Sequence, residues 1–183
     1  ELDLSGNFYL GANMTAHTAR LYYNLIDGIA GTTNEAYAIG LNIGGATSEI
    51  RGNTIRNIYR QTGATGVGEG CAINLSASSS NCVVERNWIE NDQEAIDTIG
   101  IFGGSGGAHT ITGNNITGFK SGIQGGGTSG SPVTSRFNHV VRASTLAGSN
   151  GITCDFGLTE DNMIVGYAVP LGDAPTGSGN IVY

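Results

Sequence analysis

A short motif, Asn followed two residues later by Ile or Val, recurs along this chain and constrains its fold more than any other feature. Successive clear copies are 24 to 34 residues apart, and Asn180 begins a last, degenerate copy. Repeats of this length are supersecondary units that bury their apolar faces only when neighbouring units stack on them. The sequence therefore predicts a solenoid. The six clear copies begin at Asn24, Asn53, Asn87, Asn114, Asn138 and Asn162.

Two further apolar positions recur once in each repeat of this motif. One stands three residues before the Asn, as at Leu21 and Ile50. The other follows a Gly or Ala and opens a run with period-two alternation, which indicates a strand with one buried face. Each repeat thus supplies three short strands. The opening pairs are Ala38-Ile39, Ala72-Ile73, Ala95-Ile96, Gly122-Ile123, Gly151-Ile152 and Ala168-Val169.

We expect an all-β fold, a right-handed, single-stranded parallel β-helix of about six to seven coils. One domain covers residues 1–183, with entry strands over 1–16, regular coils over 17–170 and a terminal coil over 171–183. The repeated asparagines form a structural ladder at a bend, where Asn tolerates left-handed backbone and stacked amides bond to one another along the axis. The Ile or Val of each motif, from Ile26 to Ile164, forms one buried column.

The Asn-x-Ile repeats with Gly-Ile strands resemble the parallel β-helix repeats of pectin-lyase-like proteins, most of all those of phage tailspikes and tail fibres. The resemblance covers roughly residues 17–170. It implies glycan binding along the outer faces of the strands, a homotrimer of helices packed side by side, and a place in a virion tail or outside the cell. The three cysteines leave at least one thiol unpaired, which favours a phage protein assembled in the cytoplasm.

Charge and composition exclude several other classes. The formal net charge is −7 with a single lysine, so the chain lacks the basic stripe that nucleic acid requires. No apolar run is long enough to span a membrane. The cysteines have no metal-ligand spacing, and His17, His109 and His139 fall in separate repeats, so we expect no metal and no cofactor.

The outward column of the strand that begins each repeat offers candidate sugar contacts. Asn74, Gln124 and Thr153 supply uncharged hydrogen-bonding groups, which suit sugar hydroxyls. Trp88 follows a motif Asn and should point outward as a stacking platform. The same positions also suit an ordinary solvated β face. The full column is predicted as Gly40, Asn74, Asp97, Gln124, Thr153 and Pro170.

Catalysis is the least constrained prediction. Glycoside hydrolysis usually needs two carboxyl groups about 5 to 9.5 Å apart, and Asp97 with Glu94 is the best candidate pair. A lyase would instead use a basic residue, and Lys120, Arg136 and Arg142 are available. The Arg-x-Pro-x-x-Arg pattern of pectate lyases and the Asn-Thr-Asp run of polygalacturonases are absent. Two alternatives therefore stay open, a non-catalytic structural β-helix such as a capsid decoration or adhesin stalk, and a fragment of a secreted polysaccharide lyase or hydrolase.

Overall fold

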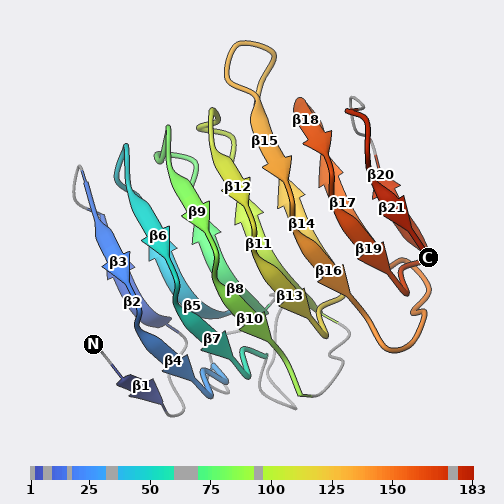
Figure 1. Ribbon diagram of the computed structural model, residues 1–183. Helices are drawn as coiled ribbons and strands as arrows, with labels where there is room; N and C mark the ends of the chain where they lie inside the picture. Colours follow the sequence, from blue (N-terminus) through green and yellow to red (C-terminus); the bar gives the residue numbers. More distant parts are fainter. Residues whose placement is uncertain are drawn as a thin grey trace.

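The computed structural model describes residues 3–5, 10–15, 18–31, 37–59, 70–92, 97–172 and 177–183. Within these ranges the chain forms short strands and turns and no helix, and therefore no helix that could span a membrane. The strands build three parallel sheets that follow one another around a solenoid (Figure 1). The predicted all-β parallel solenoid is confirmed.

Each coil contributes one strand to each sheet, in the order sheet B, sheet C, sheet A. Sheet A contains β1 (Asp3–Ser5), β4 (Leu25–Asp27), β7 (Thr54–Arg56), β10 (Trp88–Glu90), β13 (Asn115–Thr117), β16 (His139–Val141), β19 (Met163–Val165) and β21 (Ile181–Val182). Sheet B contains β2 (Leu10–Met14), β5 (Ala38–Ile43), β8 (Gly70–Leu75), β11 (Thr98–Gly103), β14 (Ser121–Gly125), β17 (Asn150–Cys154) and β20 (Val169–Gly172). Sheet C contains β3 (Arg20–Tyr22), β6 (Glu49–Arg51), β9 (Val83–Glu85), β12 (Thr110–Thr112), β15 (Val133–Arg136) and β18 (Gly157–Glu160).

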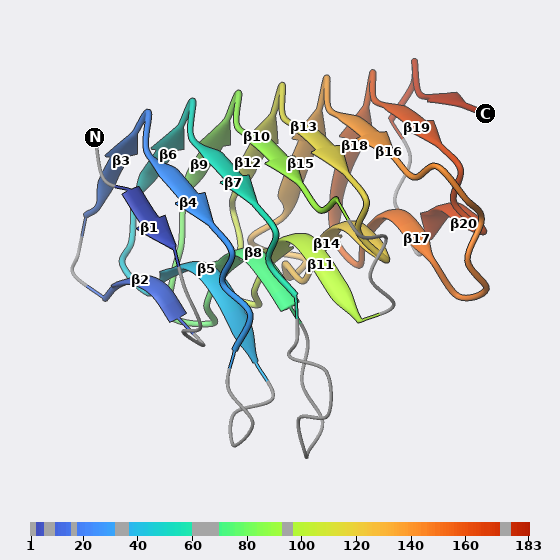
Figure 2. The same cartoon turned by 90° about the horizontal axis from the view of Figure 1, so that it is seen from below.

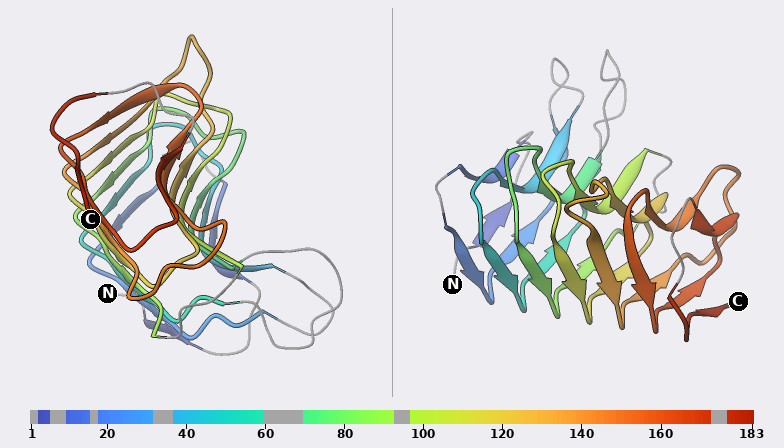
Figure 3. Two further views of the ribbon diagram at one scale, coloured as in Figure 1. Left: turned by 90° about the vertical axis from the view of Figure 1, so that its right-hand side faces the viewer. Right: turned by 90° about the horizontal axis from the view of Figure 1, so that it is seen from above.

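The solenoid has about five turns within the described residues, slightly fewer than the six to seven coils predicted. Seen along the axis, the coils overlay one another around a single interior (Figure 3). That interior is filled by stacked columns of Ile, Leu and Val. The predicted column from Ile26 to Ile164 is fully buried, and its members pair in register from coil to coil. In sheet C the buried column turns polar, with Ser135 and Thr159 after Ile111.

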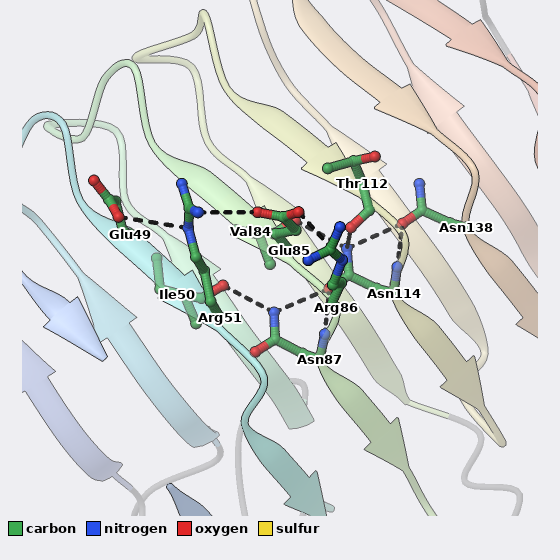
Figure 4. A network of polar contacts seen from close by, with 10 residues as sticks. All are labelled: Glu49, Ile50, Arg51, Val84, Glu85, Arg86, Asn87, Thr112, Asn114 and Asn138. Atoms are coloured by element: carbon green, nitrogen blue, oxygen red, sulfur yellow. Dashed lines mark hydrogen bonds and ion pairs between the residues drawn. The ribbon is translucent and has the colours of Figure 1, made fainter. Parts of the chain in front are cut away.

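The asparagine ladder lies at the corner between sheets C and A (Figure 4). Asn114 donates from Nδ2 to Oδ1 of Asn138 at 3.0 Å, and its own Oδ1 accepts from Nδ2 of Asn87 at 2.9 Å. The same amide-to-amide bond links successive motif asparagines from Asn24 to Asn180. The predicted bonding along the axis is therefore confirmed.

The backbone role predicted for these asparagines is wrong. The left-handed residue of each corner is the one before the Asn, as at Arg86 with φ 55° and Phe137 with φ 54°. The residue before the Asn makes the sharp bend. The Asn side chain therefore points inside, where its amide forms hydrogen bonds with neighbouring coils. Near the same corner, a partly exposed ion-pair network joins Glu49, Arg51 and Glu85 on the outer face of sheet C.

A column of small residues crosses sheet B because successive backbones approach closely there. A Cβ added at Gly40 would lie 2.6 Å from the carbonyl oxygen of Ala72, and one at Gly100 would lie 2.6 Å from that of Gly122. The inside–outside alternation slips at this column, so that β5 has the burial order Ala38 in, Ile39 out, Leu41 in and Asn42 out. The slip decides which side chains of sheet B reach the surface.

Candidate functional site: a groove on the outer face of sheet B

Three of the predicted sugar contacts share one outward column of sheet B. Asn74 pairs with Phe102, Phe102 pairs with Gln124, and Gln124 pairs with Thr153. Toward the N-terminus the column continues through Asn42 and Asn13, and toward the C-terminus it ends at Gly172. The structure thus brings Asn74, Gln124 and Thr153 together, as the sequence predicted.

The other three predicted members of this column are wrong. Asn42, Phe102 and Gly172 stand where Gly40, Asp97 and Pro170 were expected. Two effects explain the error. The alternation slips at the glycine column, which the period-two pattern ignores. In addition, Ile101 of β11, and not Ile96, pairs with Ile73.

Two adjoining pockets form a groove along this column. The first has a volume of about 340 Å³ and is lined by Tyr37, Ile39, Cys71, Asn74, Ile99, Phe102 and Gln124. The second, of about 590 Å³, adds Thr153, Asp155 and the backbone of Gly104 and Gly126. Phe102 and Gln124 line both pockets. We call this continuous surface the sheet B groove. Its lining residues lie on or beside β5, β8, β11, β14 and β17, the sheet B strands that Figure 2 shows side by side.

The sheet B groove joins apolar and uncharged polar surface. Ile39, half-buried in the outward row of β5, and Ile99, largely buried, line the groove floor, and Phe102 and Tyr37 add ring faces beside them. Asn74 donates to Oδ1 of Asn42 at 2.7 Å, which fixes its amide. The side chains of Gln124 and Thr153 make no hydrogen bond within the described part of the chain. Asp155 is exposed at one end and is the groove's only carboxylate among its described lining residues.

No protein-family model, curated protein or solved structure matches this chain. The parallel β-solenoid therefore rests on the structure itself.

The predicted catalytic pair is only partly described. Glu94 lies outside the described residues. Asp97 directly precedes β11, and its carbonyl oxygen accepts a hydrogen bond from the backbone nitrogen of Gly70 at 2.9 Å. Asp97 therefore stands two residues before Ile99, at the margin of the sheet B groove. Asp92, which replaces an apolar residue of the repeat, is exposed.

Trp88 lies away from this groove. It is on β10 in sheet A, and its Nε1 donates to Oε2 of Glu90 at 2.6 Å. The sequence prediction also missed Phe102, Tyr37 and Asp155. The signal for Phe102 is the pair Gly100-Ile101, which matches the pairs Gly122-Ile123 and Gly151-Ile152 more closely than Ala95-Ile96 does.

Buried titratable groups occupy the interior beneath the corner between sheets B and C. His109 is almost fully buried, and desolvation lowers its pKa to about 4. Its Nδ1 accepts from the backbone nitrogen of Cys82 at 3.3 Å. Burial raises the pKa of the thiols of Cys82 and Cys154. Within the described ranges, no group of three or more His, Cys, Asp or Glu side chains is arranged to hold a metal ion.

Proposed function

We propose that this chain is a polysaccharide-binding β-solenoid domain whose sheet B groove holds a glycan strand along the solenoid axis. The observation that carries the proposal is the continuity of the two pockets through Phe102 and Gln124. A polymer needs an open, elongated site, and this groove extends over several coils. In keeping with the resemblance to tailspikes, we place the domain in a virion tail or at a cell surface, as a trimer of parallel solenoids.

The lining of the groove favours a glycan of low charge. Sugar rings present apolar faces and hydroxyl groups, and the groove offers ring faces at Tyr37 and Phe102 beside the polar side chains of Asn74, Gln124 and Thr153. The chain carries a net charge of −7, and Asp155 adds a negative charge at one end of the groove. Strongly anionic polymers would be repelled by this field.

Cleavage of the bound glycan is the second part of the proposal. An inverting or retaining hydrolase needs two carboxyl groups about 5 to 9.5 Å apart. Asp97 at the groove margin, with Glu94, is the candidate pair, and the basic residues Lys120, Arg136 and Arg142 are the candidates for a lyase.

A structural role without catalysis, as in a capsid decoration or adhesin stalk, is the second candidate function. The observation that favours it is the single carboxylate, Asp155, among the described residues that line the groove. One carboxylate there does not supply the acid pair that hydrolysis usually uses.

The deciding experiment combines binding and cleavage on one panel of capsule, lipopolysaccharide, plant and algal polysaccharides. Retention on immobilised glycan measures binding, reducing-end release measures any cleavage, and absorbance at about 235 nm marks the unsaturated product of a lyase. Gln124→Ala should weaken retention, because Gln124 is an exposed member of both pockets. Thr110→Ala, at an exposed position on sheet C, is the matched control.

Each outcome has a separate meaning. Reducing ends that disappear in Asp97→Asn support hydrolysis by that acid. Reducing ends together with absorbance support a lyase. Retention without cleavage supports a binding domain. Absence of retention across the panel, or equal retention by the Gln124→Ala and Thr110→Ala variants, would overturn the proposed role of the sheet B groove.

A further inference from the structure

A second hollow lies on the outer face of sheet A, away from the sheet B groove. It has a volume of about 510 Å³ and is shallow. Two outward columns of three neighbouring coils form its base, and the corner residues Gly113 and Phe137 close one side. We call it the Trp88 hollow. Its base consists of Trp88, Asn115 and His139 in one column and Glu90, Thr117 and Val141 in the other.

Two aromatic side chains border the hollow and are largely exposed. Trp88 is 51% exposed and Phe137 is 63% exposed. The smaller Asn115 lies between Trp88 and His139 in the column, where its shorter side chain leaves room between theirs. The volume is within the range of pockets for small ligands, roughly 300 to 1,000 Å³.

Phe137 occupies the left-handed corner position that recurs before each motif Asn. Its φ is 54°, in the left-handed region that disfavours bulky side chains. Other coils place Gly52 and Gly113 at this corner, or a non-glycine residue such as Arg86 or Asp161. Burial does not compensate for this conformation, because most of the side chain faces solvent. Tyr23 occupies the same corner of an earlier coil and is also exposed, with its ring against Gly52. The repeat imposes this backbone at the corner, and at Phe137 it places an exposed ring beside the hollow.

Several polar groups in the hollow have donors or acceptors left to bond a ligand. Oδ1 of Asn115 is 2.9 Å from Nδ1 of His139, and because an amide oxygen only accepts, Nδ1 must donate. With the proton on Nδ1, Nε2 is the ring nitrogen left to accept a hydrogen bond. Nδ2 of Asn115 and the hydroxyl of Thr117 have no side-chain partner within the described part of the chain. Glu90 accepts from Trp88 through Oε2, which leaves Oε1 to accept.

We propose that the Trp88 hollow binds a single pyranose unit of a glycan. Ring faces at Trp88 and Phe137 would contact the apolar faces of the sugar. Donors at Asn115 and Thr117, with acceptors at Glu90 and His139, match vicinal hydroxyl groups, each of which donates and accepts. An apolar side chain from a protein partner would bury these polar groups without partners, which is unfavourable. This site is separate from the sheet B groove and does not depend on the function proposed for it.

Intrinsic fluorescence tests this site alone, because Trp88 is the only tryptophan of the chain. The probes are the methyl pyranosides of glucose, galactose and mannose, together with N-acetylglucosamine, titrated into the full chain to tens of millimolar. We expect a saturable change in tryptophan emission for at least one of them. Gln124→Ala should leave this response unchanged, so failure of the sheet B groove and failure of the Trp88 hollow are distinguishable.

Phe137→Gly is the decisive variant. Glycine suits the left-handed corner, so the unfolding midpoint should stay equal or rise, while loss of the ring should weaken binding about tenfold. Tyr23→Gly makes the same change at the equivalent corner outside the hollow and should leave binding unchanged. A titration without a saturable response to any probe would overturn the proposal. So would equal affinities for the parent chain and Phe137→Gly, or an emission change that follows protein concentration and dimer formation in sedimentation.

Discussion

Replacing Asn114 by alanine tests whether the buried asparagine ladder holds the coils together. Oδ1 of Asn114 accepts from the backbone nitrogen of Asn87 at 3.0 Å and from its Nδ2 at 2.9 Å. The alanine variant leaves these two donors without that acceptor in a site that is almost completely buried. Each unsatisfied buried donor costs about 1–3 kcal/mol, so we expect a loss of about 2–6 kcal/mol in the free energy of unfolding.

Asn42→Ala is the matched control, because Asn42 belongs to a second amide stack that faces outward. Asn42 donates to Asn13 at 2.8 Å and accepts from Asn74 at 2.7 Å. Water can replace these bonds at the surface, so the expected loss is below about 1 kcal/mol. Urea unfolding followed by circular dichroism, with linear extrapolation, measures both variants. Equal losses for the two, or a loss below about 1 kcal/mol for Asn114→Ala, would refute the reasoning.

Three further predictions follow from packing and burial. Gly100→Ala should lower the free energy of unfolding by about 1–3 kcal/mol in urea, because its Cβ would meet the carbonyl oxygen of the next coil, while Gly130→Ala, with open space around it, should change little. Burial holds the pKa of His109 at about 4, below the value of about 6.5 for an unfolded chain. Between those values only the unfolded state takes up the proton, so stability should fall by up to about 3 kcal/mol as the pH drops from about 6.5 to 4, and His109→Gln should remove this component. Burial raises the thiol pKa values of Cys82 and Cys154, so neither should react with a thiol reagent at neutral pH until urea unfolds the chain, and rapid labelling of the folded protein would contradict this.

The fold was predictable because its strongest constraints repeat along the sequence. Ile26, Ile55 and Ile89 recur after a motif Asn, and the same buried column and amide ladder appear in the structure. The register within sheet B was harder to predict from the sequence. Ile96 and Ile101 both follow a small residue, and the choice between them depends on close backbone contact at Gly100, which no local pattern of hydrophobicity records.

The candidate sites were predictable only where Gly-Ile pairs marked the sheet B register correctly. Gln124 and Thr153 follow Gly-Ile pairs and were placed correctly, whereas Phe102 was missed because its strand was assigned too early. The Trp88 hollow is harder still to foresee. Asn115 and His139 lie 24 residues apart and meet only because successive coils stack in register.

Because each coil pairs in register with the next, equivalent positions along the sheet B groove have a fixed spacing. Its lining side chains recur once per coil, at intervals of about 4.8 Å along the axis. For a linear polymer in the groove to place equivalent groups at equivalent positions of the groove, its repeat length must be a simple multiple of this coil spacing. Inserting or deleting a whole coil would then lengthen or shorten the groove by one coil spacing, without altering the spacing of the remaining positions.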